Sequence, residues 1–324
     1  MSAVPISELM LALEAEGEAA LARHGDGPFL LEIPTQDPTG ILDKTLEHRA
    51  STTARTVAFD EGLLLELKRT RGSKDARVFP VQEGTTIGRS SACAVQLPGE
   101  ESVSKEHARF EHKDGAWHLV DLGSTNGSFV GRDRLESGGQ RRLEELVAVQ
   151  TGSRRFAFVL REDLLALLTP LTSCEPIPLE RLRFELEALG SRRFLLRHTS
   201  SYLLVSEREE SEAPDAASKP FTPREAYPLI PPGPITLGRT SQATITIRRG
   251  SVSKWHAKLT RRGEDEWELM DTGSSNGTSV NGRRLEPNAP VRLNPWDALS
   301  FGPSIGGLYL GARGLLEFLV DADA

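Results

Sequence analysis

The chain has 324 residues, of which 38% are hydrophobic and 26% are charged, which suits a soluble protein with about two globular domains. Its formal net charge of −7 argues against a general nucleic-acid binder, because phosphate backbones attract clustered Lys and Arg. It shows neither a secretory leader nor an apolar run long enough to span a bilayer, so we expect a cytoplasmic protein without membrane insertion.

Residues 1–33 are expected to form an N-terminal helical segment, in which Ile6 to about Arg23 is predicted to be an amphipathic helix. Leu9, Leu13 and Leu21 fall loosely on one helical face, and Ser7 is a candidate N-cap. Residues 34–62 are polar, mixed in charge and rich in Thr, a composition typical of a flexible linker.

A different pattern begins in residues 63–160, which we expect to form the first β domain. Apolar residues alternate with polar ones in Ala116–Leu122 and Arg155–Val159, a period of two that predicts short strands. The intervening turns contain Gly, Asn and Ser, as in Ser124–Gly127. This pattern favours an antiparallel sandwich.

Residues 161–201 are predicted to be an inter-domain segment that is partly helical. Arg161–Leu171 has a helical pattern, whereas Pro178–Leu189 fits both helical spacing and strand alternation, and the sequence does not separate the two. The strings "PFLLE" near Phe29 and "RFLLR" near Phe194 hint that the flanking segments are also repeated.

Residues 202–320 are expected to form the second β domain, followed by a tail at 321–324. Residues 207–226 within it are polar and rich in Glu, Pro and Ala, so we expect a disordered insertion there. The two cysteines, Cys93 and Cys174, lack metal-ligand spacing, so we predict no disulfide framework, metal site or cofactor.

Three blocks of the first β domain return in the second in the same order. Thr85–Leu97 matches Ile235–Ile247, Ser102–Phe110 matches Ser251–Leu259, and Asp121–Val130 matches Asp271–Val280. A repeat of this length is a duplicated domain and not a solenoid unit. The sequence therefore predicts an all-β protein with two related sandwiches.

The repeated blocks contain the residue types of a hydrolase triad: Ser104, His107 and Asp121 in the first copy. In a strand, however, Ser and His three residues apart point to opposite faces, and Ser104 does not lie in a Gly-x-Ser-x-Gly elbow. We therefore expect no enzyme.

The same blocks suit recognition of a phosphate. Arg89 follows Gly88 at the end of a predicted strand, where its guanidinium fork suits phosphate or carboxylate oxygens. Ser104 offers a hydroxyl donor and Lys105 a positive charge, while Asn126 in its turn can pair with a peptide backbone.

Taken in order, Gly-Arg, Ser-x-x-His and Ser-Thr-Asn-Gly or Ser-Ser-Asn-Gly resemble forkhead-associated (FHA) domains, which read phosphorylated motifs. The resemblance covers roughly Leu63–Leu160 and Tyr202–Val320. It implies two FHA-type antiparallel β-sandwiches, each of eleven strands, with short helical flanking segments. Residues at the matching positions are implied to contact a phosphothreonine peptide: Arg89, Ser104, Lys105, Thr125 and Asn126 in the first domain, and Arg239, Ser253, Lys254, Ser275 and Asn276 in the second. Six motif residues are implied to be structural: Gly88, His107, Gly127, Gly238, His256 and Gly277.

The two copies differ in ways that bear on loops. The family usually has Asn-Gly after the last motif valine, which the second copy keeps at Asn281-Gly282, whereas the first has Gly131-Arg132. The approach to Ser104 is acidic (Glu100–Glu101) and that to Ser253 basic (Arg248–Arg249). We therefore expect the second domain to favour acidic residues around the phosphothreonine, and the first not to.

The resemblance implies a non-enzymatic adaptor in Ser/Thr-kinase signalling that binds Thr-phosphorylated proteins, with no nucleic-acid partner. The alternative is a phospho-independent scaffold in a secretion or cell-envelope assembly. The Thr-rich linker adds a hypothesis of self-association, because a phosphorylated linker threonine would be a tethered ligand within one molecule or between two. Its threonines are Thr35, Thr39, Thr45, Thr52, Thr53 and Thr56.

Overall fold

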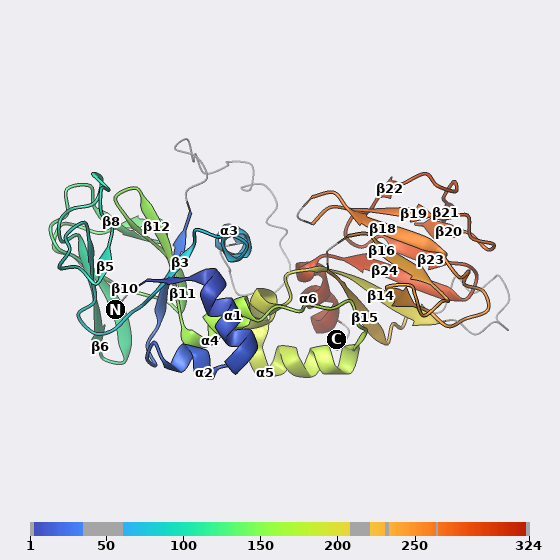
Figure 1. The fold of residues 1–324 in the computed structure, drawn as a ribbon, viewed down its shortest axis with the longest axis horizontal. Helices are drawn as coiled ribbons and strands as arrows, with labels where there is room; N and C mark the ends of the chain where they lie inside the picture. The colour runs from blue at the N-terminus through green and yellow to red at the C-terminus, as the bar shows by residue number, and fades with distance from the viewer. Residues whose placement is uncertain (1–2, 35–60, 208–220, 231–232, 264, 322–324) are drawn as a thin grey trace. The chain divides into compact units, whose positions relative to one another are not determined.

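The computed structural model describes residues 3–34, 61–207, 221–230, 233–263 and 265–321. It divides into two compact units, Met1–Thr169 and Pro170–Ala324 (Figure 1). Nearly all of the expected Thr-rich linker and most of the expected insertion at 207–226 lie outside the described residues. None of the helices in the described ranges combines the length and the apolar character needed to cross a membrane.

Two sheets form the β-sandwich of the first unit. The seven-stranded sheet contains, in spatial order, β1 (Val4–Pro5), β3 (Arg77–Pro80), β2 (Phe29–Ile33), β12 (Arg154–Val159), β11 (Leu146–Thr151), β8 (Ser128–Val130) and β9 (Asp133–Arg134). The five-stranded sheet contains β10 (Gln140–Arg142), β7 (Ala116–Asp121), β6 (Ala108–Lys113), β4 (Thr86–Gly88) and β5 (Val95–Gln96). All pairs are antiparallel except β4 with β5, which is parallel. The short β1 at the sheet edge is additional to the eleven strands that the resemblance implies.

Alternation along the strands supplies the core between the two sheets. Phe110 and Leu119 from one sheet and Phe156 and Phe158 from the other are buried in one apolar cluster. The rings of Phe110 and Phe158 stack across the sandwich with their centroids 6.3 Å apart. The predicted all-β sandwich is therefore confirmed for this unit.

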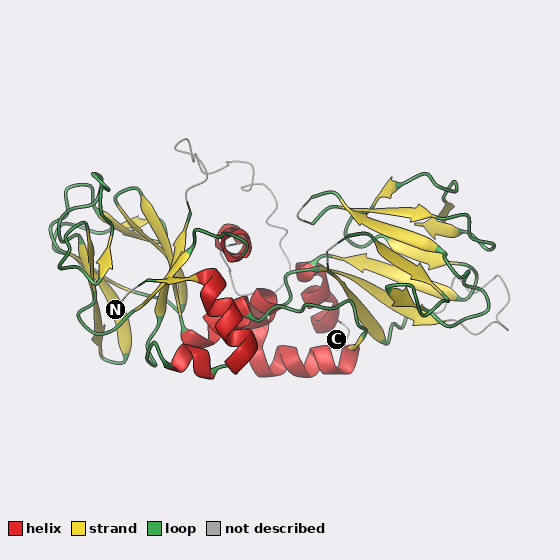
Figure 2. Cartoon of the chain, viewed as in Figure 1, coloured by secondary structure: helices red, strands yellow, loops and turns green. Residues whose placement is uncertain are grey.

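Helices cover the outer face of the seven-stranded sheet. They are α1 (Ile6–Glu16), α2 (Ala19–Ala22), α3 (Glu61–Arg71) and α4 (Arg161–Leu168). Figure 2 shows that these helices do not lie between the two sheets of this unit. Their apolar side chains, such as Leu9, Leu67 and Leu167, are buried.

The domain boundaries differ from the expectation at the N-terminal end. The helix predicted from Ile6 to about Arg23 corresponds to α1 and α2. The segment 1–33 also contains Phe29–Ile33, however, which forms β2 and pairs with both β3 and β12 inside the sheet. All five residues of β2 are buried and four of them are apolar, with Glu32 as the exception, so the strand does not alternate between apolar and polar residues. The chain at Leu63, where the first sandwich was expected to begin, lies instead in helix α3.

The second unit repeats this architecture. Its seven-stranded sheet contains β13 (Ile177–Pro178), β15 (Glu225–Leu229), β14 (Ser201–Glu207), β24 (Ile305–Leu310), β23 (Ala298–Phe301), β20 (Thr278–Val280) and β21 (Arg283–Arg284). Its five-stranded sheet contains β17 (Ile245–Thr246), β16 (Ile235–Gly238), β18 (Ala257–Arg261), β19 (Trp267–Asp271) and β22 (Val291–Arg292). The strand order is that of the first unit, and again a single pair, β16 with β17, is parallel.

The ambiguous segment after Pro178 is helical. It forms α5 (Leu179–Arg197), interrupted at Gly190, whose φ is 74°. Together with α6 (Ala312–Asp321), α5 packs on the outer face of the sheet, where Leu182 and Leu315 join Tyr202 of β14 in a second apolar cluster.

The duplicated unit is larger than the three matching blocks. Leu31 of β2 pairs with Val78 of β3, as Leu204 of β14 pairs with Ala226 of β15. The structural counterpart of "PFLLE" is therefore β14, and not "RFLLR", which lies in helix α5.

Candidate functional site

Three loops at one end of the first sandwich meet around Ser104. The backbone N–H of Arg89, after β4, donates to the Ser104 carbonyl (3.1 Å), and the N–H of Thr125, after β7, donates to the Ser104 hydroxyl (3.1 Å). The side chains of Arg89, Lys105, Thr125 and Asn126 are exposed there, and Ser104 is half-buried. The structure thus brings the predicted peptide-contacting residues of the first unit to one rim.

The glycine of each Gly-Arg pair lies under the Ser-Lys backbone. A Cβ at Gly88 would lie 2.3 Å from the Lys105 carbonyl oxygen, and one at Gly238 would lie 2.0 Å from that of Lys254. Only glycine permits this approach. Gly88 and Gly238 therefore let the loop that contains Ser and Lys pack against the end of β4 and of β16.

His107 joins two of the loops from below. Its buried ring accepts a hydrogen bond at Nδ1 from the N–H of Ser104 (3.0 Å), so Nε2 carries the proton and donates to the Gly127 carbonyl (3.1 Å). Burial lowers the pKa of His107, which favours this neutral form. The ring therefore braces the Ser104 loop against the loop that carries Asn126.

Asp121, at the end of β7, orders the turn that carries Thr125 and Asn126. Its carboxylate accepts hydrogen bonds from the N–H groups of Gly123 and Ser124 (both 2.9 Å) and from the hydroxyls of Ser124 (2.6 Å) and Ser128 (2.7 Å). Burial alone would raise the pKa of Asp121, but these hydrogen bonds lower it below its ordinary value. Sequence reasoning considered Asp121 only as a triad member, although its repetition in "DLGSTNG" and "DTGSSNG" was a signal for this role.

These contacts do not form a catalytic triad. The segment of Ser104 and His107 is a turn and not a strand, and both ring nitrogens of His107 face backbone groups of Ser104 and Gly127. The ring is therefore not placed to take a proton from the Ser104 hydroxyl. The Asp121 carboxylate is occupied by its own turn.

Asn126 is anchored and still has free bonding capacity. Its Nδ2 donates to the Ser102 carbonyl (2.7 Å), which leaves Oδ1 and a second amide hydrogen for a peptide backbone. The exposed side chain therefore has the bonding groups predicted for peptide contact.

Arg134 of β9 was not predicted from the sequence. Gly127 has a φ of +83°, and a Cβ there would lie 2.7 Å from Nε of Arg134. The guanidinium thus lies against the Asn-Gly turn, where it lines a cavity of ≈ 310 Å³ together with Asp121 and Ser124. The repeat of Arg134 as Arg284 in "GRDRLE" and "NGRRLE" was the only signal.

The second unit has the same constellation. Ser253 N–H donates to Nδ1 of His256 (3.1 Å), Nε2 of that ring donates to the Gly277 carbonyl (3.2 Å), and Ser275 N–H donates to the Ser253 hydroxyl (3.0 Å). The amide of Asn276 donates to the Ser251 carbonyl (2.7 Å), and Lys254 is exposed. Nε of Arg239 donates to the Val252 carbonyl (3.2 Å), which holds the guanidinium beside the Ser253 loop.

Comparison with known proteins identifies the repeated region. The FHA domain family model matches residues 85–150 and 235–302. An "Oxoglutarate dehydrogenase inhibitor" from Corynebacterium diphtheriae is 36% identical over 84 residues, which are 26% of this chain and 56% of that protein. The "FHA domain-containing protein FhaB" from Mycobacterium tuberculosis is 30% identical over 105 residues, 32% of this chain and 56% of that protein. The chain therefore spans about half the length of these curated relatives. Among solved structures, the FHA domain of an Arabidopsis thaliana hypothetical protein is 24% identical with a TM-score of 0.28, covering 35% of this chain and 86% of that one.

Proposed function

The chain carries two FHA domains in tandem, and from this premise we propose that it is a non-enzymatic adaptor with two phosphothreonine-peptide sites. The proposed contacts are the predicted ones: Arg89, Ser104, Lys105, Thr125 and Asn126 in the first site, and Arg239, Ser253, Lys254, Ser275 and Asn276 in the second. We place the adaptor in the cytoplasm, where Ser/Thr kinases generate its ligands.

The observation that carries this proposal is the convergence of an Arg, a Ser and a Lys on one rim in both units. A phosphothreonine presents about −1.5 to −2 charges and three acceptor oxygens at neutral pH. The guanidinium of Arg89 can bind two of these oxygens side by side, and Lys105 adds charge without fixed direction. The Ser104 hydroxyl accepts from the N–H of Thr125 and donates a long hydrogen bond to Oγ1 of Thr125 (3.5 Å), which it can exchange for a bond to the phosphate.

Asn126 and Thr125 would hold the peptide that carries the phosphate. The turn is fixed by Asp121 and His107 before any ligand arrives, so little entropy is lost on binding. A pre-formed rim of this kind suits recognition of a peptide.

The names of the relatives support the proposal of an adaptor but do not identify its partners. One bears the name of an enzyme inhibitor, which is consistent with binding to another protein. We propose that the partners are Thr-phosphorylated proteins in Ser/Thr-kinase signalling, including the kinase or its substrates. Two sites on one chain could bind a doubly phosphorylated partner with raised avidity.

Peptide titration tests the proposal. Peptides containing phosphothreonine, and the same peptides without phosphate, are titrated against the wild-type chain and the Arg89→Ala and Arg239→Ala variants. We expect micromolar binding that requires phosphate, which is a binding free energy of about −8 kcal/mol per site. Each arginine variant should lose one of the two sites. Arg142→Ala is a matched control, because Arg142 is an exposed arginine of β10 outside the rim. Binding that persists without phosphate would instead favour the phospho-independent scaffold.

Self-association through a phosphorylated linker threonine remains a prediction, because these threonines lie outside the described residues. A kinase-treated chain that stays monomeric and still binds added peptide at both sites would contradict it.

A further inference from the structure

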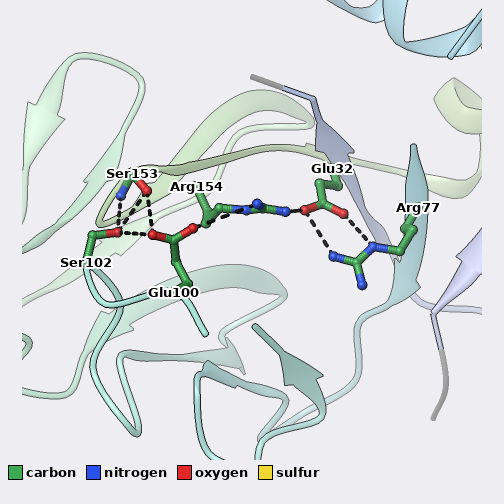
Figure 3. A network of polar contacts seen from close by, with 6 residues as sticks. All are labelled: Glu32, Arg77, Glu100, Ser102, Ser153 and Arg154. Atoms are coloured by element: carbon green, nitrogen blue, oxygen red, sulfur yellow. Dashed lines mark hydrogen bonds and ion pairs between the residues drawn. The ribbon is translucent and has the colours of Figure 1, made fainter. Parts of the chain in front are cut away.

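A chain of ionic contacts runs from strand β2 to the rim of the first site (Figure 3). It begins at Glu32, which is only 3% exposed. Its carboxylate accepts from Nε of Arg77 (2.7 Å) and forms a second ion pair with Arg154 of β12. Two arginines thus compensate a carboxylate buried in the sheet.

The opposite side of Arg154 faces the loop before Ser104. Nη1 of Arg154 lies 3.8 Å from Oε2 of Glu100, while Oε1 of Glu100 accepts from the hydroxyls of Ser102 (2.9 Å) and Ser153 (3.0 Å). Figure 3 shows the carboxylate held between these hydroxyls and the guanidinium. Glu100 is therefore a fixed negative charge and not a freely moving surface group.

This carboxylate lies beside the proposed peptide contacts. Ser102, which hydrogen-bonds Glu100, also accepts the amide of Asn126 at its carbonyl oxygen. The Glu100 side chain remains 27% exposed, so a cationic side chain of a bound peptide can reach it.

The second unit keeps the hydroxyls but reverses the charge. Ser251 and Ser304 are hydrogen-bonded to each other as Ser102 and Ser153 are, yet the residue two before Ser251 is Arg249 where the first unit has Glu100.

The ion pair of Glu32 and Arg154 is also replaced by apolar residues in the second unit. Val205 of β14 pairs with Gly307 of β24 as Glu32 of β2 pairs with Phe156 of β12, so Val205 occupies the position of Glu32. Ile305, directly after Ser304 as Arg154 follows Ser153, is 1% exposed in the sandwich core. The second unit therefore forms the same strand pairing without these ions, and replacement of a buried ion pair by apolar residues is often neutral for stability.

We propose that Glu100 makes the first site select phosphothreonine peptides that carry a basic side chain near the phosphothreonine, and that Arg154 and Glu32 are positioning residues for its carboxylate. The inference rests on the proposed phosphopeptide function. Glu32 binds Arg154 more closely than Glu100 does, so the Glu100 carboxylate keeps accepting capacity for a Lys or Arg. Charges at a rim select among partners in this way.

The test isolates the first site with Arg239→Ala. Phosphothreonine peptides that differ only by Lys or Glu, placed in turn at each flanking position, are titrated together with their unphosphorylated forms. We expect at least one position at which the Lys peptide binds about tenfold better than the Glu peptide, because Glu100 attracts the first and repels the second. Glu100→Gln should make the two peptides bind equally, and Glu100→Arg should favour Glu. Glu101→Gln is the matched control and should keep the preference, because Glu101 is the exposed neighbour.

The positioning role is tested by Glu32→Val combined with Arg154→Ile, which copies Val205 and Ile305 of the second unit. The preference of the first site for the Lys peptide over the Glu peptide should fall to about threefold, while the melting temperature stays equal to that of the Arg239→Ala chain. A role in folding alone would lower the melting temperature and leave the preference intact. The inference is overturned if phosphate-dependent binding shows no preference at any position, or if Glu100→Gln keeps it. Absence of any difference between phosphorylated and unphosphorylated peptides would instead overturn the proposed function.

Discussion

The backbone N–H of Ser104 donates a hydrogen bond to Nδ1 of His107 at 3.0 Å, and Ser253 and His256 repeat this contact at 3.1 Å. The contact requires a neutral ring with an unprotonated Nδ1. In both units it ties the serine proposed to bind phosphate to the carbonyl of the Asn-Gly turn through the same imidazole. The Ser-x-x-His motif is therefore a brace between two loops.

Removal of this brace should weaken folding and binding together. His107→Ala leaves the Ser104 N–H and the Gly127 carbonyl without their partner and opens a buried cavity. We expect a loss of about 2–4 kcal/mol in the free energy of unfolding of the first unit. Urea denaturation measures this loss, and peptide titration should show the first site weakened. His112→Ala, at an exposed histidine of β6, is the control and should have a small effect.

The same histidines predict a dependence on pH. Burial lowers the pKa of His107 and of His256 below the ordinary value of 6.5, with Asp121 and Asp271 as the charged groups that oppose this shift. As the pH falls, the unfolded chain therefore takes up protons before the folded chain does. The stabilisation is complete above about pH 6.5 and is lost progressively below it.

Thermal melts between about pH 7.5 and 5.5 test this dependence. The melting temperature should fall across the range, and the His107→Gln/His256→Gln double variant should show a smaller slope than the wild-type chain. An equal slope in both would show that other groups cause the dependence.

The strand-end glycines should not tolerate a side chain. Gly238→Ala would place a Cβ 2.0 Å from the Lys254 carbonyl oxygen, so the Ser253 loop must move away from β16. We expect loss of binding at the second site and a destabilisation of about 1–3 kcal/mol. Gly250→Ala is the matched control, since no atom of the described residues lies within 4 Å of a Cβ there. Equal affinities for the two variants would contradict the proposed close packing.

The basic approach to the second site should select acidic peptides. Arg248 and Arg249 are exposed before Ser253, and Arg249 pairs with Glu207 at the surface. In an Arg89→Ala chain, a peptide array should favour Asp and Glu around the phosphothreonine, more strongly at low salt. Arg249→Glu should weaken this preference about tenfold, and Arg313→Glu on α6 should not. Identical preferences of the two sites would reject the prediction.

Local sequence patterns predicted the parts of the site that depend on neighbouring residues. Ser104 and His107, three residues apart in one turn, were recognisable as a motif, as was the Asn126 turn. Strand β2 was missed because five consecutive buried residues carry no period-two signal. Glu32 and Arg154 were missed because their contact depends on the pairing of β2 with β12, which are far apart in sequence. Arg134 was missed because nothing local indicates that its guanidinium lies under Gly127.

Calorimetric titration of the wild-type chain with a single phosphothreonine peptide tests the central claim most directly. We predict a stoichiometry of two peptides per chain, one in Arg89→Ala or Arg239→Ala, and none in the double variant or with the unphosphorylated peptide. The account would be contradicted if the heat of binding stayed the same after the phosphate was removed from the peptide or both arginines were replaced.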